Sequence, residues 1–181
     1  MIRPPPLGTA ARPQPAPILV VWLGHTPRRR LAWHRNSPRR GPDPKPDSLL
    51  VDTGILVALF DRQDPHHAAA TAWLARCDAT LHTIEAVLTE AAYFLPARLR
   101  PALARMVAQG VLRLHPLSPA GHGRLAQLFD KYCDIDPDWA DLGLVCLAET
   151  SGLHRIATLD SSDFKVYRIH GRKRFALELL G

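Results

Sequence analysis

The sequence predicts an α/β protein, a three-layer α/β/α sandwich in which helices cover both faces of a central, mostly parallel sheet. Two observations support this prediction. Short apolar segments of strand length alternate with segments whose apolar residues recur at the 3.6-residue spacing of a helix. The run Leu49–Phe60 also stops at one acid, Asp52, before it resumes as an apolar helix. A buried parallel strand delivers a carboxylate to the carboxyl edge of a sheet in this way.

Residues 1–47 differ in composition from the rest of the chain. They hold 11 of the 17 prolines and nine Lys/Arg against two acids, whereas residues 48–181 hold 14 Lys/Arg against 15 acids. We therefore expect 1–47 to be a disordered Pro/Arg-rich extension and 48–181 to be one folded domain. Because the extension carries the excess positive charge, the net charge of +6 is not evidence that the folded domain binds nucleic acid. A basic arm that touches nucleic acid or a membrane surface is the functional alternative. A start codon assigned too far upstream would give the same composition.

The expected elements follow in order along the folded part. Strands are expected at 48–51, 79–82, 111–115, 155–160 and, as an edge strand, 166–169. Helices are expected at 55–60, 65–76, 84–95, 97–109, 119–132 and 138–149. Thr83 and Ser118 are suitable N-caps, and Gly152 is a suitable end for the last helix.

The three cysteines argue against a zinc ribbon or a disulfide framework. Cys77, Cys133 and Cys146 are odd in number and far apart, without CxxC spacing. Buried reduced thiols in a cytoplasmic protein fit better. The apolar run 18–23 is too short to span a bilayer, and nearby prolines interrupt any signal helix, so we expect no membrane association.

Four acids predict a metal-dependent hydrolytic site. Asp52 and Asp160 end strands, and Glu90 and Asp141 lie on core helices, although Glu90 also fits a solvated surface position. If both strands are central and parallel, their carboxyl ends are neighbours, and clustered carboxylates repel one another unless a divalent cation neutralises them. Oxygen ligands without His or Cys suit Mg²⁺ or Mn²⁺. Such an ion polarises a phosphodiester and activates water, which indicates phosphodiester hydrolysis.

In this order the residues resemble the PIN domain family, and they are most similar to the VapC-type toxins of prokaryotic toxin–antitoxin pairs. The resemblance covers about residues 48–180. The segments that carry it are Leu50–Thr53, Glu90–Tyr93, Asp138–Asp141 with Leu147–Glu149, and Thr158–Phe164.

The resemblance implies an Mg²⁺-dependent ribonuclease with Asp52, Glu90, Asp141 and Asp160 as its acidic quartet, in which Asp52 and Asp141 are the surest metal ligands. It assigns supporting roles to the hydroxyls of Thr53 and Thr158 and to the acids Asp138 and Asp163. An RNA substrate, a small antitoxin and a homodimer are the partners it implies. Gly54 departs from the family, in which many members carry serine at this place.

Other functions fit the residues less well. Asp52-Thr53-Gly54 also matches an aspartic protease signature, but such an enzyme needs two of these carboxylates within mostly β structure. A phosphatase that forms an aspartyl-phosphate on Asp52 would carry a second acid where Gly54 stands. A PIN-domain nuclease of RNA processing, and a PIN-like domain that binds RNA or a partner without cutting, remain open.

Overall fold

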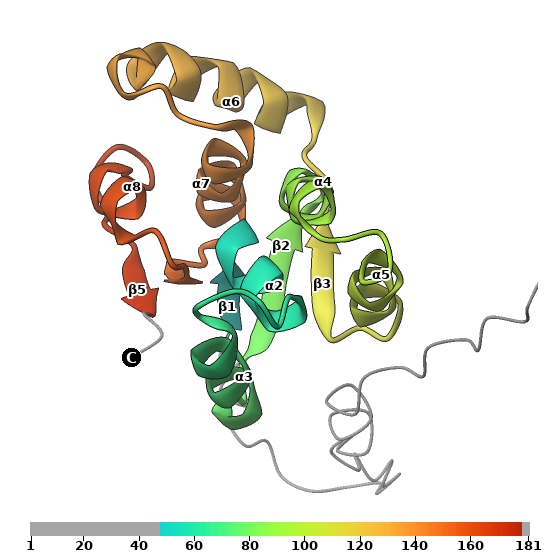
Figure 1. Ribbon diagram of the computed structural model, residues 1–181. Coiled ribbons are helices and arrows are strands. Elements are labelled where there is room, and N and C mark those ends of the chain that lie inside the picture. The colour runs from blue at the N-terminus through green and yellow to red at the C-terminus, as the bar shows by residue number, and fades with distance from the viewer. Residues whose placement is uncertain (1–47, 179–181) are drawn as a thin grey trace, which may run out of the picture. The chain divides into compact units, whose positions relative to one another are not determined.

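The computed structural model describes residues 48–178, which form a five-stranded sheet covered by helices (Figure 1). The strands are β1 (Ser48–Val51), β2 (Thr80–Ile84), β3 (Leu112–His115), β4 (Arg155–Ala157) and β5 (Ala176–Glu178). Their order in the sheet is β3-β2-β1-β4-β5, and every neighbouring pair is parallel. The predicted α/β class is confirmed. Residues 1–47 lie outside the described residues, so their expected disorder stays a prediction.

The helices connect these strands by crossovers. They are α2 (Thr53–Phe60), α3 (His67–Arg76), α4 (Glu85–Phe94), α5 (Arg100–Ala108), α6 (Pro119–Lys131), the 3₁₀ turn η1 (Cys133–Ile135), α7 (Trp139–Ser151) and α8 (Ser161–Val166). The chain moves outward from β1 to β3 and then returns to β4 and β5. Because parallel crossovers are right-handed, this reversal puts α2–α5 on one face of the sheet and α6–α8 on the other (Figure 1).

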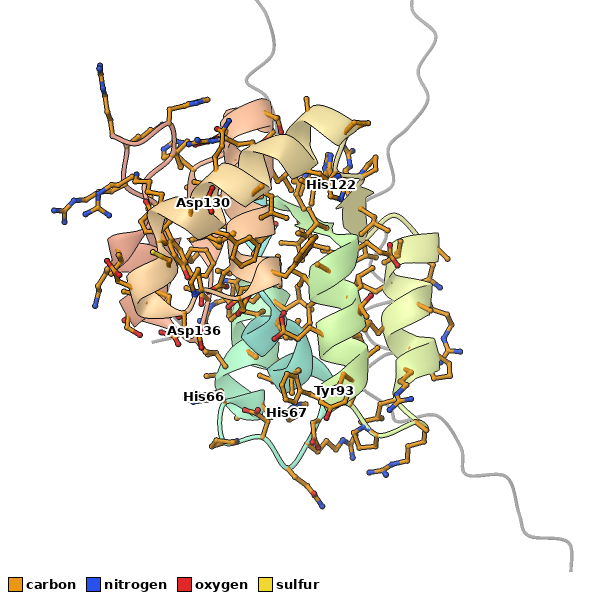
Figure 2. The ribbon with its side chains drawn as sticks, turned by 90° about the horizontal axis from the view of Figure 1, so that it is seen from above. His66, His67, Tyr93, His122, Asp130 and Asp136 are labelled. Carbon is orange, nitrogen blue, oxygen red and sulfur yellow. The ribbon has the colours of Figure 1, made fainter. Side chains whose placement is uncertain are left out.

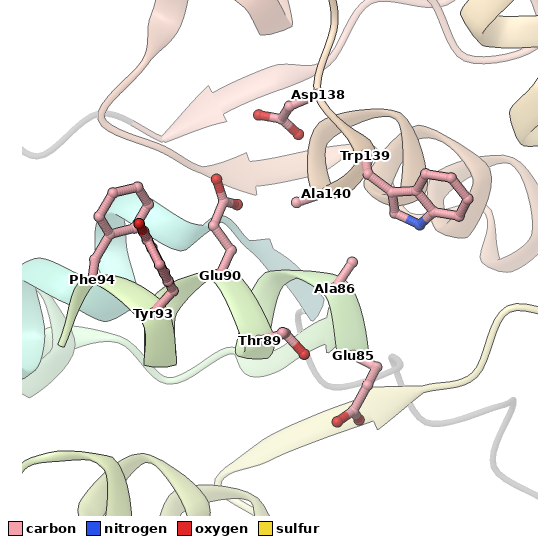
Figure 3. A pocket seen from close by; sticks show the side chains of 9 residues that line it. All are labelled: Glu85, Ala86, Thr89, Glu90, Tyr93, Phe94, Asp138, Trp139 and Ala140. Atoms are coloured by element: carbon pink, nitrogen blue, oxygen red, sulfur yellow. The ribbon is translucent and has the colours of Figure 1, made fainter. Parts of the chain in front are cut away.

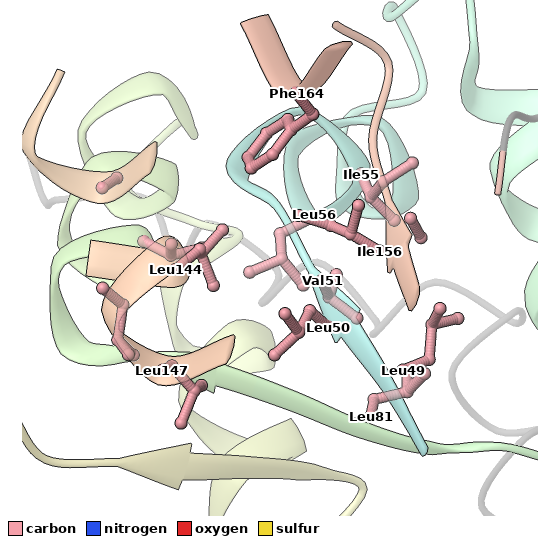
Figure 4. Packing of buried hydrophobic residues seen from close by; sticks show 14 of the residues in the cluster. Leu49, Leu50, Val51, Ile55, Leu56, Leu81, Leu144, Leu147, Ile156 and Phe164 are labelled. Carbon is pink, nitrogen blue, oxygen red and sulfur yellow. The ribbon is translucent and has the colours of Figure 1, made fainter. Parts of the chain in front are cut away.

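The core is built around β1, which lies in the middle of the sheet. Leu49, Leu50 and Val51 are fully buried because helices cover both faces of this strand (Figure 4). On one face α7 approaches β2 closely. A Cβ at Gly143 of α7 would lie 2.3 Å from Cδ1 of Ile84, so the glycine permits this contact. The core therefore fixes the carboxyl end of β1, where Asp52 follows.

The predicted N-cap at Thr83 is wrong. The strand β2 continues to Ile84, and α4 begins only at Glu85. The β-branched Thr83 suits the strand, and its hydroxyl donates a hydrogen bond to the carbonyl oxygen of Val51 (3.0 Å). Ser118 and Gly152, in contrast, are caps as the sequence predicts: Ser118 is the N-cap of α6, and Gly152 is the C-cap of α7.

The predicted edge strand at 166–169 is also wrong, and β4 is shorter than expected. The strand β4 ends at Ala157. Asp160 lies beyond it and is the N-cap of the helix α8. The edge strand is instead β5, which pairs in parallel with β4. Val166, Tyr167 and Ile169 are of residue types that favour strands, but in the structure they belong to a helix end and a loop.

The three cysteines are free, but only Cys146 is buried, since Cys77 is half-buried and Cys133 exposed. Within residues 48–178, the helices are all too short or too polar to cross a membrane.

Glu149 joins α7 to α6 and to the loop before β5. Its carboxylate accepts hydrogen bonds from Nε and Nη2 of Arg124 (2.8 and 3.0 Å) and from the backbone N–H of His170 (2.7 Å). Burial alone would raise the pKa of Glu149, but Arg124 and the His170 N–H lower it below its usual 4.5. The ionised carboxylate therefore stabilises the fold.

We expect Glu149→Gln to lower the free energy of unfolding by about 2 kcal/mol near neutral pH, because Arg124 loses its charged partner. Since the pKa of Glu149 is lowered in the folded state, its contribution is complete above pH 4.5 and lost as the pH falls through the folded-state value. Urea unfolding at neutral and acidic pH measures both effects.

Asp130→Asn is the control, because Asp130 is exposed on α6 (Figure 2), and we expect it to change stability by less than about 0.5 kcal/mol. Equal stability of the wild type and Glu149→Gln at neutral pH would show that the contacts of Glu149 do not stabilise the fold.

Candidate active site

One cleft of about 460 Å³ opens at the carboxyl edge of the sheet, and it brings the predicted acids together. Its acidic lining residues are Asp52, Asp64, Glu90, Asp138, Asp141, Asp160 and Asp163. The remaining lining residues are Thr53, Gly54, Val57, Phe94 and Leu159. All four acids of the predicted quartet and both supporting acids therefore face the same space. Thr158, by contrast, is buried behind the lining.

Asp52 lies at the end of the central strand, with only 7% of its surface exposed. Its Oδ1 accepts a hydrogen bond from the N–H of Thr53 (2.6 Å), and its Oδ2 accepts one from the Thr158 hydroxyl (2.8 Å). Burial raises the pKa of Asp52 to about 6. The two hydrogen bonds lower this pKa, and the charges of nearby acids raise it by a smaller amount. Uncharged donors thus hold this carboxylate in place without neutralising it.

Asp141 lies in the first turn of α7 and is as buried as Asp52. Burial raises its pKa to about 9, and the charges of Asp52 and Asp138 add to that rise. Asp138 is exposed at the N-cap, where its Oδ1 accepts a hydrogen bond from the N–H of Asp141 (2.7 Å). Capping accounts for Asp138, but it does not account for a buried acid at Asp141.

Glu90 faces the cleft from α4, next to the helix face that packs on the core. Its Oε2 accepts a hydrogen bond from the hydroxyl of Thr53 (2.7 Å). Thr53 thus contacts two acids of the quartet, Asp52 through its backbone and Glu90 through its side chain. The half-buried position and this bond favour the functional interpretation of Glu90 over a solvated surface position.

Asp160 and Asp163 line the cleft from the N-cap and the first turn of α8. Asp160 is exposed, and its Oδ1 accepts hydrogen bonds from the N–H (2.9 Å) and the hydroxyl of Ser162. These bonds lower the pKa of Asp160, whereas burial and the charge of Asp160 raise that of Asp163. The hydroxyl of Thr158 also accepts a hydrogen bond from the N–H of Asp160 (3.0 Å), so Thr158 connects Asp160 to Asp52.

The donor set of the cleft suits a hard divalent cation. The lining offers seven carboxylates and no Lys, Arg, His or Cys among the residues described, and oxygen ligands of this kind select Mg²⁺ or Mn²⁺. Burial and the neighbouring acids raise the pKa values of Asp52 and Asp141, and a cation bound beside them would lower both values. Within 48–178, no three acidic, His or Cys side chains converge at metal-ligand spacing as they stand. The four acids of the quartet nevertheless line one cleft.

Two further residues belong to this site without a prediction from the sequence. Asp64 lines the cleft from the loop after α2, and its Oδ1 accepts a hydrogen bond from the N–H of His66 (2.7 Å), which resembles ordinary turn chemistry. Tyr167 is 1% exposed, and burial together with the charges of Asp141 and Asp163 raises the pKa of its hydroxyl. The incorrect strand at 166–169 concealed Tyr167, whereas no sequence signal marks Asp64.

Comparison with known proteins identifies the family. The PIN domain model matches residues 49–169. Ribonuclease VapC26 of Mycobacterium tuberculosis is 29% identical over 133 residues, which cover 71% of this chain and 98% of that protein. The crystal structure of VapC20 of Mycobacterium tuberculosis, a toxin that cleaves the sarcin–ricin loop, matches with a TM-score of 0.59 and 18% identity. That match covers 64% of this chain and 92% of the VapC20 chain, and it bears on the fold alone. Because the family model spans more than half of the sequence, the chain belongs to the PIN domain family.

Proposed function

We propose that the protein is an Mg²⁺-dependent endoribonuclease whose acidic quartet is Asp52, Glu90, Asp141 and Asp160. The observation that carries this proposal is that all four acids line one cleft. Two of them, Asp52 and Asp141, are buried. Mn²⁺ suits the same oxygen donors. The resemblance to ribonuclease VapC26 supports RNA as the substrate.

In this proposal Asp52 and Asp141 are the main metal ligands, and Glu90 and Asp160 complete the site. When bound, the ion supplies Lewis acid catalysis that favours attack of water on a phosphodiester. The chain holds the acids in position for this. The hydroxyl of Thr158 fixes Asp52, Thr53 fixes Glu90, and the Asp138 cap fixes the start of α7 under Asp141. Asp163 adds negative charge at the rim.

We further propose that the protein is the toxin of a type II toxin–antitoxin pair in the cytoplasm, held inactive by a small antitoxin and able to form a homodimer. The similarity to VapC26 supports this proposal, and the fold is the one that the toxin VapC20 also has. A PIN-domain nuclease of RNA processing without an antitoxin is the second candidate, because the same acids would serve it. A PIN-like protein that binds without cutting fits less well, because the complete quartet would then have no use.

We expect Asp52→Asn and Asp141→Asn each to reduce cleavage of single-stranded RNA by about 100-fold or more, since each removes a negative oxygen ligand at nearly constant volume. A chelator should abolish cleavage by the wild type, and added Mg²⁺ should restore it. Gel analysis of end-labelled RNA incubated with the purified protein measures both.

Asp130→Asn is the matched control, because this exposed acid lies outside the cleft, and it should cleave at the wild-type rate. Cleavage that survives both cleft substitutions, in preparations free of contaminating nuclease, would refute the proposed site.

Metal binding should also appear as thermal stability, independently of activity. We expect millimolar Mg²⁺ to raise the melting temperature of the wild type by about 2 °C or more, because a ligand of the folded state stabilises it by mass action. Asp52→Asn should gain little from Mg²⁺. It should also melt no lower than the wild type in chelator, because it removes a desolvated charge. An equal response to Mg²⁺ in both proteins would place the ion elsewhere.

Expression in a bacterial host tests the toxin proposal. Growth should stop with the wild type and continue with Asp52→Asn, and the product of the adjacent upstream gene should relieve the arrest. RNA cleavage in vitro without growth arrest would favour the RNA-processing candidate.

A further inference from the structure

A second groove of about 680 Å³ adjoins the acidic cleft (Figure 3). It lies between α4 and the start of α7, and its lining residues are Glu85, Ala86, Thr89, Glu90, Tyr93, Phe94, Asp138, Trp139 and Ala140. Glu90, Phe94 and Asp138 line both spaces, so the groove continues directly from the cleft. Its volume is in the range of small-molecule sites.

Exposed aromatic side chains gather in this groove. Tyr93, Phe94 and Trp139 are 79%, 58% and 54% exposed, and they are three of the five large hydrophobic side chains that are exposed within 48–178. The rings of Tyr93 and Phe94 meet edge to face, with their centroids 5.4 Å apart. The indole ring of Trp139 packs against the ring of Phe129, with the two centroids 5.7 Å apart. Aromatic rings that contact one another and remain open to solvent suit a flat ligand that stacks on them.

The negative charge of the groove disfavours a phosphate but tolerates an uncharged nucleobase. Its charged lining residues are the acids Glu85, Glu90 and Asp138, and no Lys or Arg joins them in the described part of the chain. An RNA phosphate would be repelled here. A nucleobase carries no charge, and its N–H groups can donate hydrogen bonds to carboxylates at the groove wall.

We propose that this groove is a base-stacking subsite, in which Tyr93 with Phe94 holds the nucleoside adjoining the scissile phosphate of the RNA substrate. This inference rests on the proposed function. A phosphodiester bound at the quartet must extend a nucleoside on each side, and the groove begins where the cleft ends, at Glu90 and Asp138. Aromatic stacking of this kind holds single-stranded bases without requiring a particular sequence.

Abasic substitution in the substrate tests the subsite directly. The full-length protein is given a single-stranded RNA oligonucleotide that it cuts, and the same RNA with one base removed at each position that flanks the cut. We expect one abasic position to slow cleavage by the wild type about 5-fold or more, as the loss of one stacked base predicts. Tyr93→Leu should cut the intact RNA slower by a similar factor and should be insensitive to that abasic position.

Two control variants separate stacking from other roles of Tyr93. Tyr93→Phe keeps the ring and should behave as the wild type. Ile135→Ala truncates another exposed apolar side chain, outside the groove, and should also leave the pattern unchanged. Independent, multiplying effects of Tyr93→Leu and the abasic position would overturn the proposal.

Other outcomes are equally decisive. If Tyr93→Leu cuts every RNA as the wild type does but weakens self-association or binding of a protein partner, the groove is a protein interface and the subsite is refuted. If the wild type cuts no RNA, the proposed function fails. In that case the affinity for RNA tests the groove separately and is measured by fluorescence anisotropy of labelled RNA in the presence of chelator. A stacking subsite must still bind intact RNA more tightly than the abasic RNA. Equal binding of the two RNAs would refute the subsite as well.

Discussion

The unfavourable burial of two neighbouring carboxylates is the interaction around which the site is arranged. Asp52 and Asp141 are almost inaccessible to water, and the charge of Asp52 contributes to the raised pKa of Asp141. Neither residue can withdraw into solvent, because Asp52 is fixed to the central strand and Asp141 to the first turn of an apolar helix. The fold therefore keeps two desolvated acids close together, and burial favours their protonated forms unless a cation binds beside them.

Glu149 shows how the same chain treats an acid that stabilises the fold. Its buried carboxylate is paired with Arg124 and a backbone N–H, and its pKa is lowered. In the cleft, the donors to Asp52 among residues 48–178 are the uncharged groups of Thr53 and Thr158, and the pKa of Asp52 is raised. A protein that needed these carboxylates for stability alone would be expected to pair them in the same way. The contrast favours a cation from solution as the missing partner.

The sequence predicted the parts of the structure that depend on local patterns. The apolar run before Asp52 gave β1 with its exact bounds, and periodicity located the helices that carry Glu90 and Asp141. It failed where a long-range contact decides the outcome. Thr83 has the type of an N-cap, but its bond to Val51 keeps it in a strand, and β5 is three residues long, too short for a period to appear. Asp64 and the aromatic groove come together only through the tertiary fold.

The central claim is that Asp52 and Asp141 bind a divalent cation at the carboxyl edge of the sheet. A crystal structure of the wild type grown with Mn²⁺ tests it most directly, because anomalous scattering locates the ion without assumptions about its ligands. The account predicts an anomalous peak within about 2.5 Å of carboxylate oxygens of both residues, with water completing the coordination. Clear density for Asp52 and Asp141 without such a peak, or a peak bound only by other residues, would contradict the claim.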